Sequence, residues 1–369
     1  MSAELVPHPA AHELAWVYRP VTVVRAGAGV RVENRRSFGD LRDLRLTTLA
    51  LSDGEVIGRP RWVAPKVAPN GCAGVALPDL PDGTEVVRFE WRTRADSWFA
   101  PKGHLVAWDE VVVVEPARGS RRRADGRAPA GLVEPRLDLW RAPIDNDGFK
   151  LMPDLARRLR VGGQALAAWQ DAGVDSHDPE ELVTHRATID DVDGGTIYRH
   201  LVEVPGHLAD LPRVGVVFTL PGSFDRVRWY GRGPHENYSD RSRSAMLGIW
   251  EGPPDELPYL VPQEFGLRTE CRWVDLIESS TGRIVRIVRV DAIDHPLHVS
   301  ATHHRAAELA AGASAFDLVA APELIVRLDV AHRVLGTASC GPEVLDRYRL
   351  GAGTYEFAYR VGVTEPEST

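Results

Sequence analysis

The sequence predicts an all-β chain made of two successive domains, and three observations lead to this prediction. Short runs rich in Val, Leu, Thr and aromatic residues recur along most of the chain, and such runs are typical of β-strands. Turn signals such as Asp53-Gly54 and Asp82-Gly83 separate several of these runs. Helical composition is confined to a short segment, 163–172, for which we expect one or two helical turns.

Between residues 19 and 114 the pattern is that of a β-sandwich. The expected strands are 21–25, 30–34, 44–51, 85–93 and 104–114. Strand-sized segments with regular turn signals and no clear helix favour a sandwich of about a hundred residues. We therefore place a first domain over residues 1–115.

The stretch 115–131 interrupts this pattern, because it is rich in Pro, Gly and Arg. Such a composition is typical of a linker, which we place at 116–131. Arg121, Arg122 and Arg123 could also form an anion-binding patch. However, no aromatic residues are interleaved with them and the chain as a whole is acidic, which favours a solvated linker.

The remaining segment, 132–369, is again mostly β and is predicted to form a second, larger domain. Its expected strands are 196–204, 213–220, 283–292 and 323–330. No internal repeat is present.

Composition and charge exclude several classes of protein. Of the 369 residues, 44% are hydrophobic and 26% are charged, and the formal net charge is −8, which argues against nucleic-acid binding. No apolar run reaches the length of about 18 residues that a membrane-spanning helix needs, and the N-terminus does not read as a signal peptide. Cys72, Cys271 and Cys340 are widely spaced, so we expect no disulfide framework and a cytoplasmic location.

The most informative stretch is 229–241, which reads W-Y-G-R-G-P-H-E-N-Y-S-D-R. Gly231 and Gly233 permit unusual backbone angles, and Pro234 restricts the turn that follows. Aromatic and hydrogen-bonding side chains crowd the same segment, which therefore predicts an ordered aromatic and polar corner. Three further motifs are W-R-A-P-I-D-N-D at 140–147, P-Q-E-F-G-L-R at 262–268 and G-T-A-S-C-G-P at 336–342.

Together, and in their order along the chain, these four motifs closely resemble signatures of the C-terminal half of the β-galactosidases of glycoside hydrolase family 2. The segments 16–21 and 348–355 resemble neighbouring parts of the same family. The resemblance implies an immunoglobulin-like β-sandwich over 1–115 and, over 132–369, a large β-supersandwich related to galactose mutarotases. Before W-R-A-P the chain departs from the family, because the usual opening strand pair looks shortened.

The resemblance also implies that the catalytic part of such an enzyme precedes the region seen here. Full-length members carry a (β/α)₈ barrel with two glutamates, and retaining chemistry needs two carboxyl groups only about 5 Å apart. We therefore expect no catalytic residue in this chain. It is interpreted as the C-terminal part, or a separately encoded small subunit, of an enzyme that hydrolyses terminal β-D-galactosyl residues with retention.

The expected partners are a barrel-containing large chain and a galactoside substrate at a shared pocket, and an oligomer is expected. No cofactor is expected in this chain, because the Mg²⁺ and Na⁺ of the family are held mainly by the barrel. His303, His304 and His332 lack the accompanying ligand spacing of a zinc site, so no metal site is predicted.

Two loops are the expected contacts with the substrate pocket. The segment 145–148 reads as a turn, because Asp and Asn side chains bond to their own backbone. In the family the next residues form a loop beside the active site, which makes Gly148 and Phe149 candidate substrate contacts. Cys340 stands where a family tryptophan stacks on the sugar. Stacking needs an aromatic face, so Cys340 is expected only at the pocket mouth.

The other motif residues have two interpretations. His235, Glu236, Asp240 and Glu264 could form an acid–base set, and mutarotases use a histidine and a carboxylate for related chemistry. In the family, however, this corner is understood as architectural. A nucleophilic Cys340 is not favoured, because it would need a partner histidine. The expected structural residues are Trp140, Arg141, Pro143, Asp145, Asn146, Asp147, Gly233, Pro234, Glu236, Asn237, Tyr238, Asp240, Arg241, Glu264, Gly266 and Arg268.

Other classes of function stay open. The chain could be a stand-alone carbohydrate-binding module, a mutarotase-like enzyme, an inactive gene remnant or a purely structural assembly domain. A domain that packs against a barrel should keep an apolar patch when alone, and Trp98, Phe99 and Trp250 are candidates for it.

Overall fold

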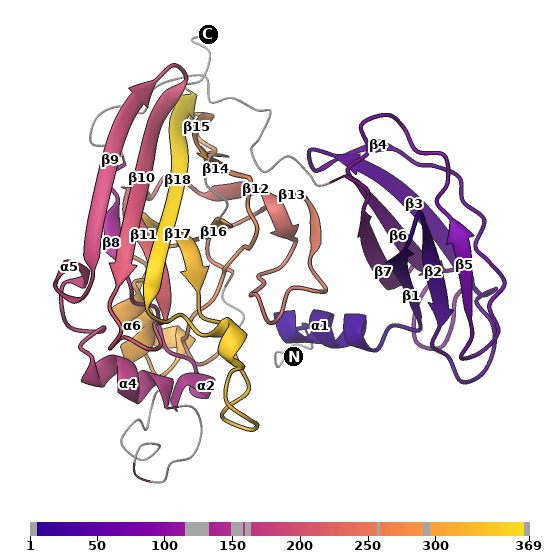
Figure 1. Ribbon diagram of the computed structural model, residues 1–369, viewed down its shortest axis with the longest axis horizontal. Helices are drawn as coiled ribbons and strands as arrows, with labels where there is room; N and C mark the ends of the chain where they lie inside the picture. The colour runs from indigo at the N-terminus through magenta and orange to yellow at the C-terminus, as the bar shows by residue number, and fades with distance from the viewer. Residues whose placement is uncertain are drawn as a thin grey trace. The chain divides into compact units, whose positions relative to one another are not determined.

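The computed structural model describes residues 6–114, 133–148, 158, 164–256, 259–290 and 296–364. The chain divides into an N-terminal unit, Ala10–Ala117, and a C-terminal unit, Arg118–Thr369 together with Met1–Pro9. Both units are built from antiparallel sheets (Figure 1), and this confirms the predicted all-β class. The expected linker 116–131 and Phe149 lie outside the described residues.

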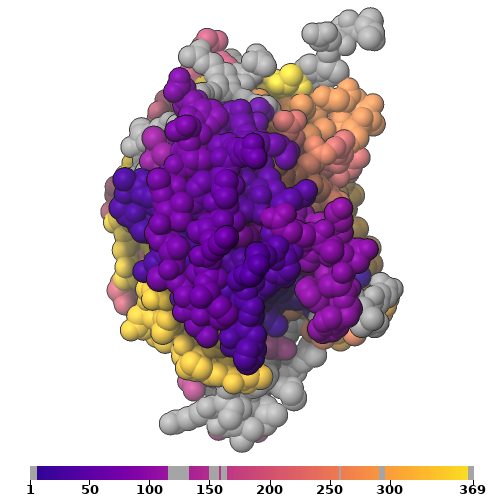
Figure 2. Space-filling model, turned by 90° about the vertical axis from the view of Figure 1, so that its right-hand side faces the viewer, coloured from indigo at the N-terminus to yellow at the C-terminus, as the bar shows by residue number. Residues whose placement is uncertain are grey.

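The N-terminal unit is a sandwich of two sheets. Helix α1 (Pro9–Val17) leads into it. One sheet has the order β1-β2-β5 and the other the order β4-β3-β6-β7, an arrangement of the immunoglobulin-like kind. Figure 2 shows its surface in indigo and purple. The strands are β1 (Val21–Ala26), β2 (Gly29–Asn34), β3 (Leu44–Ser52), β4 (Glu55–Gly58), β5 (Cys72–Ala76), β6 (Val86–Thr93) and β7 (Leu105–Val112).

Alternation along the strands explains why these two sheets pack face to face. Val30 and Val32 of β2 point into the same core as Val87, Phe89 and Trp91 of β6. Residues two apart lie on one face of a strand, so each strand contributes one apolar row to the core. The sandwich therefore follows from the period-2 pattern in the sequence.

The C-terminal unit contains a seven-stranded sheet, β13-β12-β14-β15-β18-β10-β9, and a four-stranded sheet, β16-β17-β11-β8. The strands are β8 (Arg136–Asp138), β9 (Thr184–Val192), β10 (Gly195–Val204), β11 (Arg213–Pro221), β12 (Arg226–Gly233), β13 (Met246–Gly252), β14 (Trp273–Glu278), β15 (Arg283–Arg289), β16 (His298–Thr302), β17 (Glu323–His332) and β18 (Gly353–Thr364). The helical segments are α2 (Asp145–Gly148), α4 (Ala165–Asp171), α5 (Pro179–Leu182), α6 (Ala306–Ala311), η1 (Ala315–Asp317) and η2 (Asp346–Tyr348).

One hydrophobic core joins the two sheets of this unit. Phe218 of β11 and Val326 of β17 come from the smaller sheet, and Trp229 of β12, Ile287 of β15 and Val361 of β18 from the larger. Helix α4 adds a fully buried indole to the same core. A core shared by two broad sheets agrees with the supersandwich expected for this segment.

Most local predictions agree with these elements. Each predicted strand of both units has a counterpart in the structure, and the helical segment 163–172 contains α4. The segment 145–148, for which the sequence predicts a turn, forms a single helical turn, α2. Within this turn, the carboxylate of Asp147 accepts a hydrogen bond from the N–H of Ile144 at 2.9 Å and pairs with Arg141 and Arg333. None of the helices in the described residues is long and apolar enough to cross a membrane.

Candidate functional site

The candidate site is the place where α2 meets the loop 336–342. Asn146 joins them. Its Nδ2 donates to the carbonyl oxygens of Leu335 at 3.0 Å and Gly336 at 2.7 Å, and its Oδ1 accepts from the N–H of Ser339 at 3.1 Å. The structure thus brings together the two segments that carry Gly148 and Cys340.

Asp147 holds α2 in place through buried ion pairs. It is completely buried and accepts two parallel bonds from Arg141, of 2.8 and 3.0 Å. Arg333, also completely buried, adds a third at 3.0 Å. Charge-assisted, two-pronged contacts of this kind combine strength with a defined geometry. The position of α2 is therefore set by one arginine within the motif 140–147 and by another from the distant segment after β17.

Arg333 extends this network toward the surface. Its Nε donates to both carboxyl oxygens of Asp210, at 3.0 and 3.1 Å, and its NH2 donates to Glu343 at 3.3 Å. Burial raises the pKa of Asp210, although the charge of Arg333 opposes this effect. Glu343 directly follows the loop 336–342, so the network holds the far end of that loop.

Asp240 supports the near end of the same loop. Its carboxylate accepts from the N–H of Leu335 at 3.3 Å and from the N–H of Gly336 at 2.9 Å. Gly336 has a positive φ of 65°, a backbone conformation that glycine adopts without steric cost. The corner 229–241 and the loop 336–342 are thus parts of one arrangement.

The carboxylate of Glu236 lies inside the aromatic corner. It accepts from Tyr259 OH at 2.8 Å, from the N–H of Gly266 at 2.6 Å and from Arg241. Burial raises the pKa of Tyr259 to about 12, and the neighbouring Glu236 acts in the same direction. Gly266 has a positive φ of 78°, which lets its N–H approach the carboxylate.

Asn237 joins this corner to the segment that follows Gly266. Its Nδ2 donates to the carbonyl oxygens of Arg232 at 3.2 Å and His235 at 3.0 Å, and its backbone N–H donates to Leu267 O at 2.8 Å. Its Oδ1 accepts from Thr269. The Gly233-Pro234 peptide bond at the start of this turn is cis.

Glu264 belongs to a second buried group. Its carboxylate lies 3.5 Å from Nε2 of His332. Burial alone would raise the pKa of Glu264, but His332, Arg141 and Arg213 together hold it below its ordinary value. Arg213 in turn pairs with Asp329. A carboxylate kept charged by fixed partners is suited to holding a fold together.

The other motif residues pack around these groups. Tyr238 is buried, and its ring lies 5.5 Å from that of His332. The guanidinium of Arg268 lies 4.6 Å above the ring of Trp229. Trp140 meets Trp169 edge-on at 6.1 Å. Pro143 and Gly148 are buried, whereas Asp145 is exposed.

The acid–base alternative gains little from this geometry. Glu236, Asp240 and Glu264 are engaged with different internal partners, and His235 pairs through Nε2 with Ser244 Oγ at 3.0 Å. A general acid or base must reach a substrate proton, and each of these carboxylates contacts the protein itself. The architectural interpretation stays the better supported prediction for this corner.

Cys340 is exposed and its backbone N–H donates to Thr337 O at 3.0 Å. The neighbouring side chain Ser339 Oγ lies 3.9 Å from its sulfur. The imidazole of His332 is buried and directed to Glu264 and to the carbonyl of Arg333. Because an activated thiol needs a nearby base or positive group, this arrangement does not support a nucleophilic Cys340.

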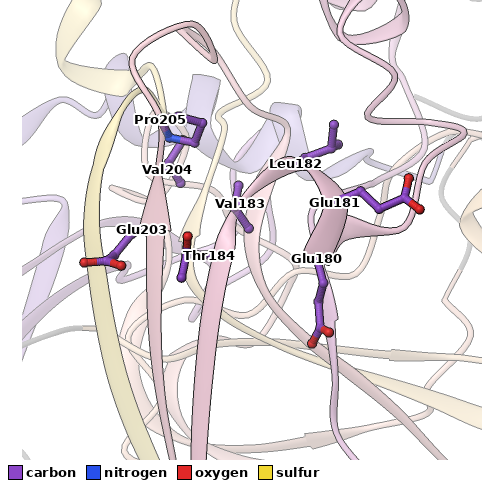
Figure 3. Close-up of a pocket in the computed structure, with 8 residues that line it drawn as sticks. All are labelled: Glu180, Glu181, Leu182, Val183, Thr184, Glu203, Val204 and Pro205. Carbon is purple, nitrogen blue, oxygen red and sulfur yellow. The ribbon is translucent and has the colours of Figure 1, made fainter.

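A depression that sequence reasoning missed lies where α5 meets β9 and β10 (Figure 3). Its lining residues are Glu180, Glu181, Leu182, Val183, Thr184, Glu203, Val204 and Pro205. From Glu180 a chain of contacts leads inward through His185 and His200 to Tyr359 OH, with distances of 3.1, 3.1 and 3.2 Å. Burial lowers the pKa of His200 to about 4.

A signal for this chain of contacts was present in the sequence. Asp193-Gly194 separates two strand-like runs, which is a hairpin signal. The hairpin pairs His185 with Val202 and His200 with Ala187, so both imidazoles lie on one face of it. Within the described residues, no group of three or more His, Cys, Asp or Glu side chains is placed to hold a metal ion.

Comparisons with known proteins place this geometry in context. The family model of the β-galactosidase small chain matches residues 117–361, and that of β-galactosidase domain 4 matches residues 30–114. A β-galactosidase of Arthrobacter sp. (strain B7) is 28% identical over 422 residues, which cover 94% of this chain and 41% of the relative.

Two further relatives that match this chain are also β-galactosidases. A β-galactosidase of Vibrio cholerae is 26% identical over 98% of this chain and 40% of its own length. β-Galactosidase BgaC of Bifidobacterium adolescentis is 34% identical over 78% of this chain and 33% of its own length. The chain therefore spans about two fifths or less of these curated relatives.

Proposed function

Because the chain belongs to the β-galactosidase small-chain family, we propose that it completes a β-galactosidase whose catalytic barrel is carried by another part of the enzyme. The whole enzyme, of glycoside hydrolase family 2, would hydrolyse terminal β-D-galactosyl residues with retention. The two catalytic glutamates, and the Mg²⁺ and Na⁺ ions, are assigned to the barrel. We further propose that the assembly works in the cytoplasm.

The observation that carries this proposal is the small-chain match over residues 117–361. The geometry at Asn146 supports it, because one side chain ties α2 to both ends of the stretch 335–339, which leads into the loop 336–342. A loop anchored in this way can present a side chain to a neighbouring surface with little loss of conformational entropy. We propose that Gly148, Phe149 and Cys340 line the mouth of the shared sugar pocket.

The test is hydrolysis of a chromogenic β-galactoside by this chain alone, by the barrel-containing chain alone and by the mixture. Activity that appears, or rises strongly, only in the mixture is the expected result. Activity of this chain alone would overturn the assignment of the catalytic glutamates to the barrel. No activity in any combination would favour a stand-alone sugar-binding module, a mutarotase-like enzyme or an inactive remnant.

Cys340 then tests the pocket loop within the active mixture. Cys340→Ala is expected to change KM for the galactoside, because its exposed side chain would line the proposed mouth of the sugar pocket. Cys72→Ala is the matched control, since Cys72 is also exposed but belongs to the N-terminal unit. Equal kinetics for both variants would remove Cys340 from the pocket and leave the subunit assignment intact.

A further inference from the structure

The seven-stranded sheet ends at β9, a strand whose outer edge stays open in the part of the chain that the structure describes. β9 pairs with β10 over all nine of its residues, Thr184–Val192, without a shift in register. Among the strands that the structure describes, none pairs with its other side, as Figure 1 shows. Eight of its nine side chains are exposed. Such an edge is a template for a further strand.

The other sheet ends of this unit, as far as they are described, offer less. β13, at the opposite end of the same sheet, has one exposed residue among seven. β8 is only three residues long, and all five residues of β16 are buried. β9 is therefore the longest and most exposed sheet end of the described C-terminal unit.

β9 lacks most of the devices by which proteins block an open edge. It contains no proline and no lysine, and its pairing shows no bulge. Ile189, with 64% of its surface exposed, lies in the middle of it. It does carry three charged residues, Arg186, Asp190 and Asp191. They would disfavour a partner strand that places like charges opposite them. Their spacing, however, makes them complementary to the same strand in reverse.

Two copies of β9 placed antiparallel about Thr188 match along their whole length. In this register Arg186 of each copy lies opposite Asp190 of the other, in two symmetric pairs. Opposite charges directly across an antiparallel pair stabilise it, and like charges destabilise it. Moving the centre by one residue would place Arg186 opposite Thr188 or Val192 instead, so the charges select one register.

The remaining positions fit the same register. His185 lies opposite Asp191 of the second copy, and Ala187 lies opposite Ile189. Even-numbered residues lie opposite even-numbered ones, and odd opposite odd. Paired side chains therefore lie on the same face of the sheet, and the backbone N–H and C=O groups at the open edge of one copy face those of the other. The pairing thus satisfies hydrogen bonding and side-chain contact together.

Contacts within one copy extend this complementarity to the neighbouring strands. Arg186 lies 3.7 Å from Glu203 of β10, and Asp190 pairs with Arg199 of β10. Across the two copies, the row would read Glu203, Arg186, Asp190 and Arg199, with alternating charge. Networks of several alternating charges contribute more than isolated surface pairs.

We propose that this chain forms a homodimer by antiparallel pairing of β9 with β9 of a second copy, with the two-fold axis at Thr188. The seven-stranded sheets of both copies would then form one continuous sheet. The interface is isologous, because the same strand contributes on both sides. The proposal depends on β9 alone and is independent of the galactosidase assignment.

Disulfide trapping on the full chain tests the register, in a background with Cys72→Ser and Cys340→Ser. Thr188→Cys is expected to give an intermolecular disulfide on mild oxidation, because opposed Cα atoms would be about 4.5–5.5 Å apart. Arg186→Cys alone should not cross-link, since its copies would lie about 13 Å apart. An equimolar mixture of Arg186→Cys and Asp190→Cys should cross-link. A monomeric Thr188→Cys, or equally fast cross-linking of Arg186→Cys alone, would overturn the proposed register.

Sedimentation velocity tests the charges without any cysteine. Arg186→Asp and Asp190→Arg should each weaken dimerisation by about tenfold or more. The double variant Arg186→Asp/Asp190→Arg should restore it, because the charges are exchanged and stay complementary. Glu251→Arg, at the exposed ion pair with Arg226 on β12 and β13, is the control and should leave dimerisation unchanged. A wild-type chain that stays monomeric up to about 0.5 mM, or a dimer insensitive to both single variants, would refute the proposal.

Discussion

Asn146 donates a hydrogen bond of 2.7 Å to the carbonyl oxygen of Gly336, a residue 190 positions later in the chain. The same side chain accepts from Ser339, so it spans the loop on which Cys340 stands. The motifs 140–147 and 336–342 thus meet through the side-chain amide of Asn146. This relationship makes the loop 336–342 part of the C-terminal unit's frame.

Replacing Asn146 should therefore loosen the loop while leaving the rest of the unit folded. In Asn146→Ala, amide hydrogen exchange of residues 335–340 should become faster, because two acceptor carbonyls and one donor N–H lose their partner. The free energy of unfolding should fall by about 1 kcal/mol. Asp145→Ala, an exposed position on the same helix, is the control. Unchanged exchange in Asn146→Ala would show that the loop is held by other contacts.

Replacing Asp147 should have a much larger effect, because it leaves Arg141 and Arg333 buried without their shared counter-ion. Breaking a buried ion pair by removing one partner costs about 3–5 kcal/mol. Asp147→Asn is expected to lower the free energy of unfolding by this amount in urea denaturation. Asp43→Asn, which breaks an exposed pair with Arg36, should change it by less than about 1 kcal/mol. Similar losses in both variants would contradict the role given to Asp147.

The stability of the chain should decrease as the pH falls from about 6.5 toward 4. Burial lowers the pKa of His200 to about 4, whereas the unfolded chain binds this proton near pH 6.5. The stabilisation is therefore complete above pH 6.5 and is lost as the pH falls through the folded pKa, a change of up to about 3 kcal/mol. Burial also lowers the pKa of His298 to about 4, which adds to the effect.

The variant His200→Phe isolates the contribution of one imidazole. It should show a weaker pH dependence of unfolding between pH 6.5 and 4, measured by urea denaturation at each pH. A Phe ring fits beside Phe357, against which the imidazole stacks at 4.8 Å. His207→Gln, at an exposed site, should retain the wild-type dependence. If His200→Phe retained it as well, the buried imidazole would not be the cause.

Gly215 should tolerate no side chain, because it lies at an irregular point of strand β11, where the register with β17 shifts. A Cβ atom there would collide with the carbonyl oxygen of Leu328 and with Oδ1 of Asp329. Gly215→Ala should therefore destabilise the chain by about 1–3 kcal/mol. Gly74→Ala in strand β5, where a Cβ atom would meet nothing within 4 Å, should be neutral or slightly stabilising. Thermal unfolding of both variants decides between these outcomes.

Much of the local structure of this protein can be predicted from its sequence. Runs rich in Val and Leu, such as 213–220 and 323–330, predicted strands, because such runs are typical of β-strands. Turn signals and the near absence of helical periodicity predicted the all-β class. The four motifs pointed to the correct family, since each combines glycine, proline, aromatic and charged residues at fixed spacing.

What local pattern could not supply is which distant segments meet. The helical turn at Asp147 forms because two arginines, one of them nearly two hundred residues away, bury its carboxylate. The contacts of His185 with His200 depend on the register of one hairpin, and the exposure of β9 depends on its place at the end of a seven-stranded sheet. The sequence by itself determined the fold class, a part of the strands and the family. The order of strands in the sheets decided which side chains are buried, paired or left at an open edge, because burial and pairing are properties of neighbours in space.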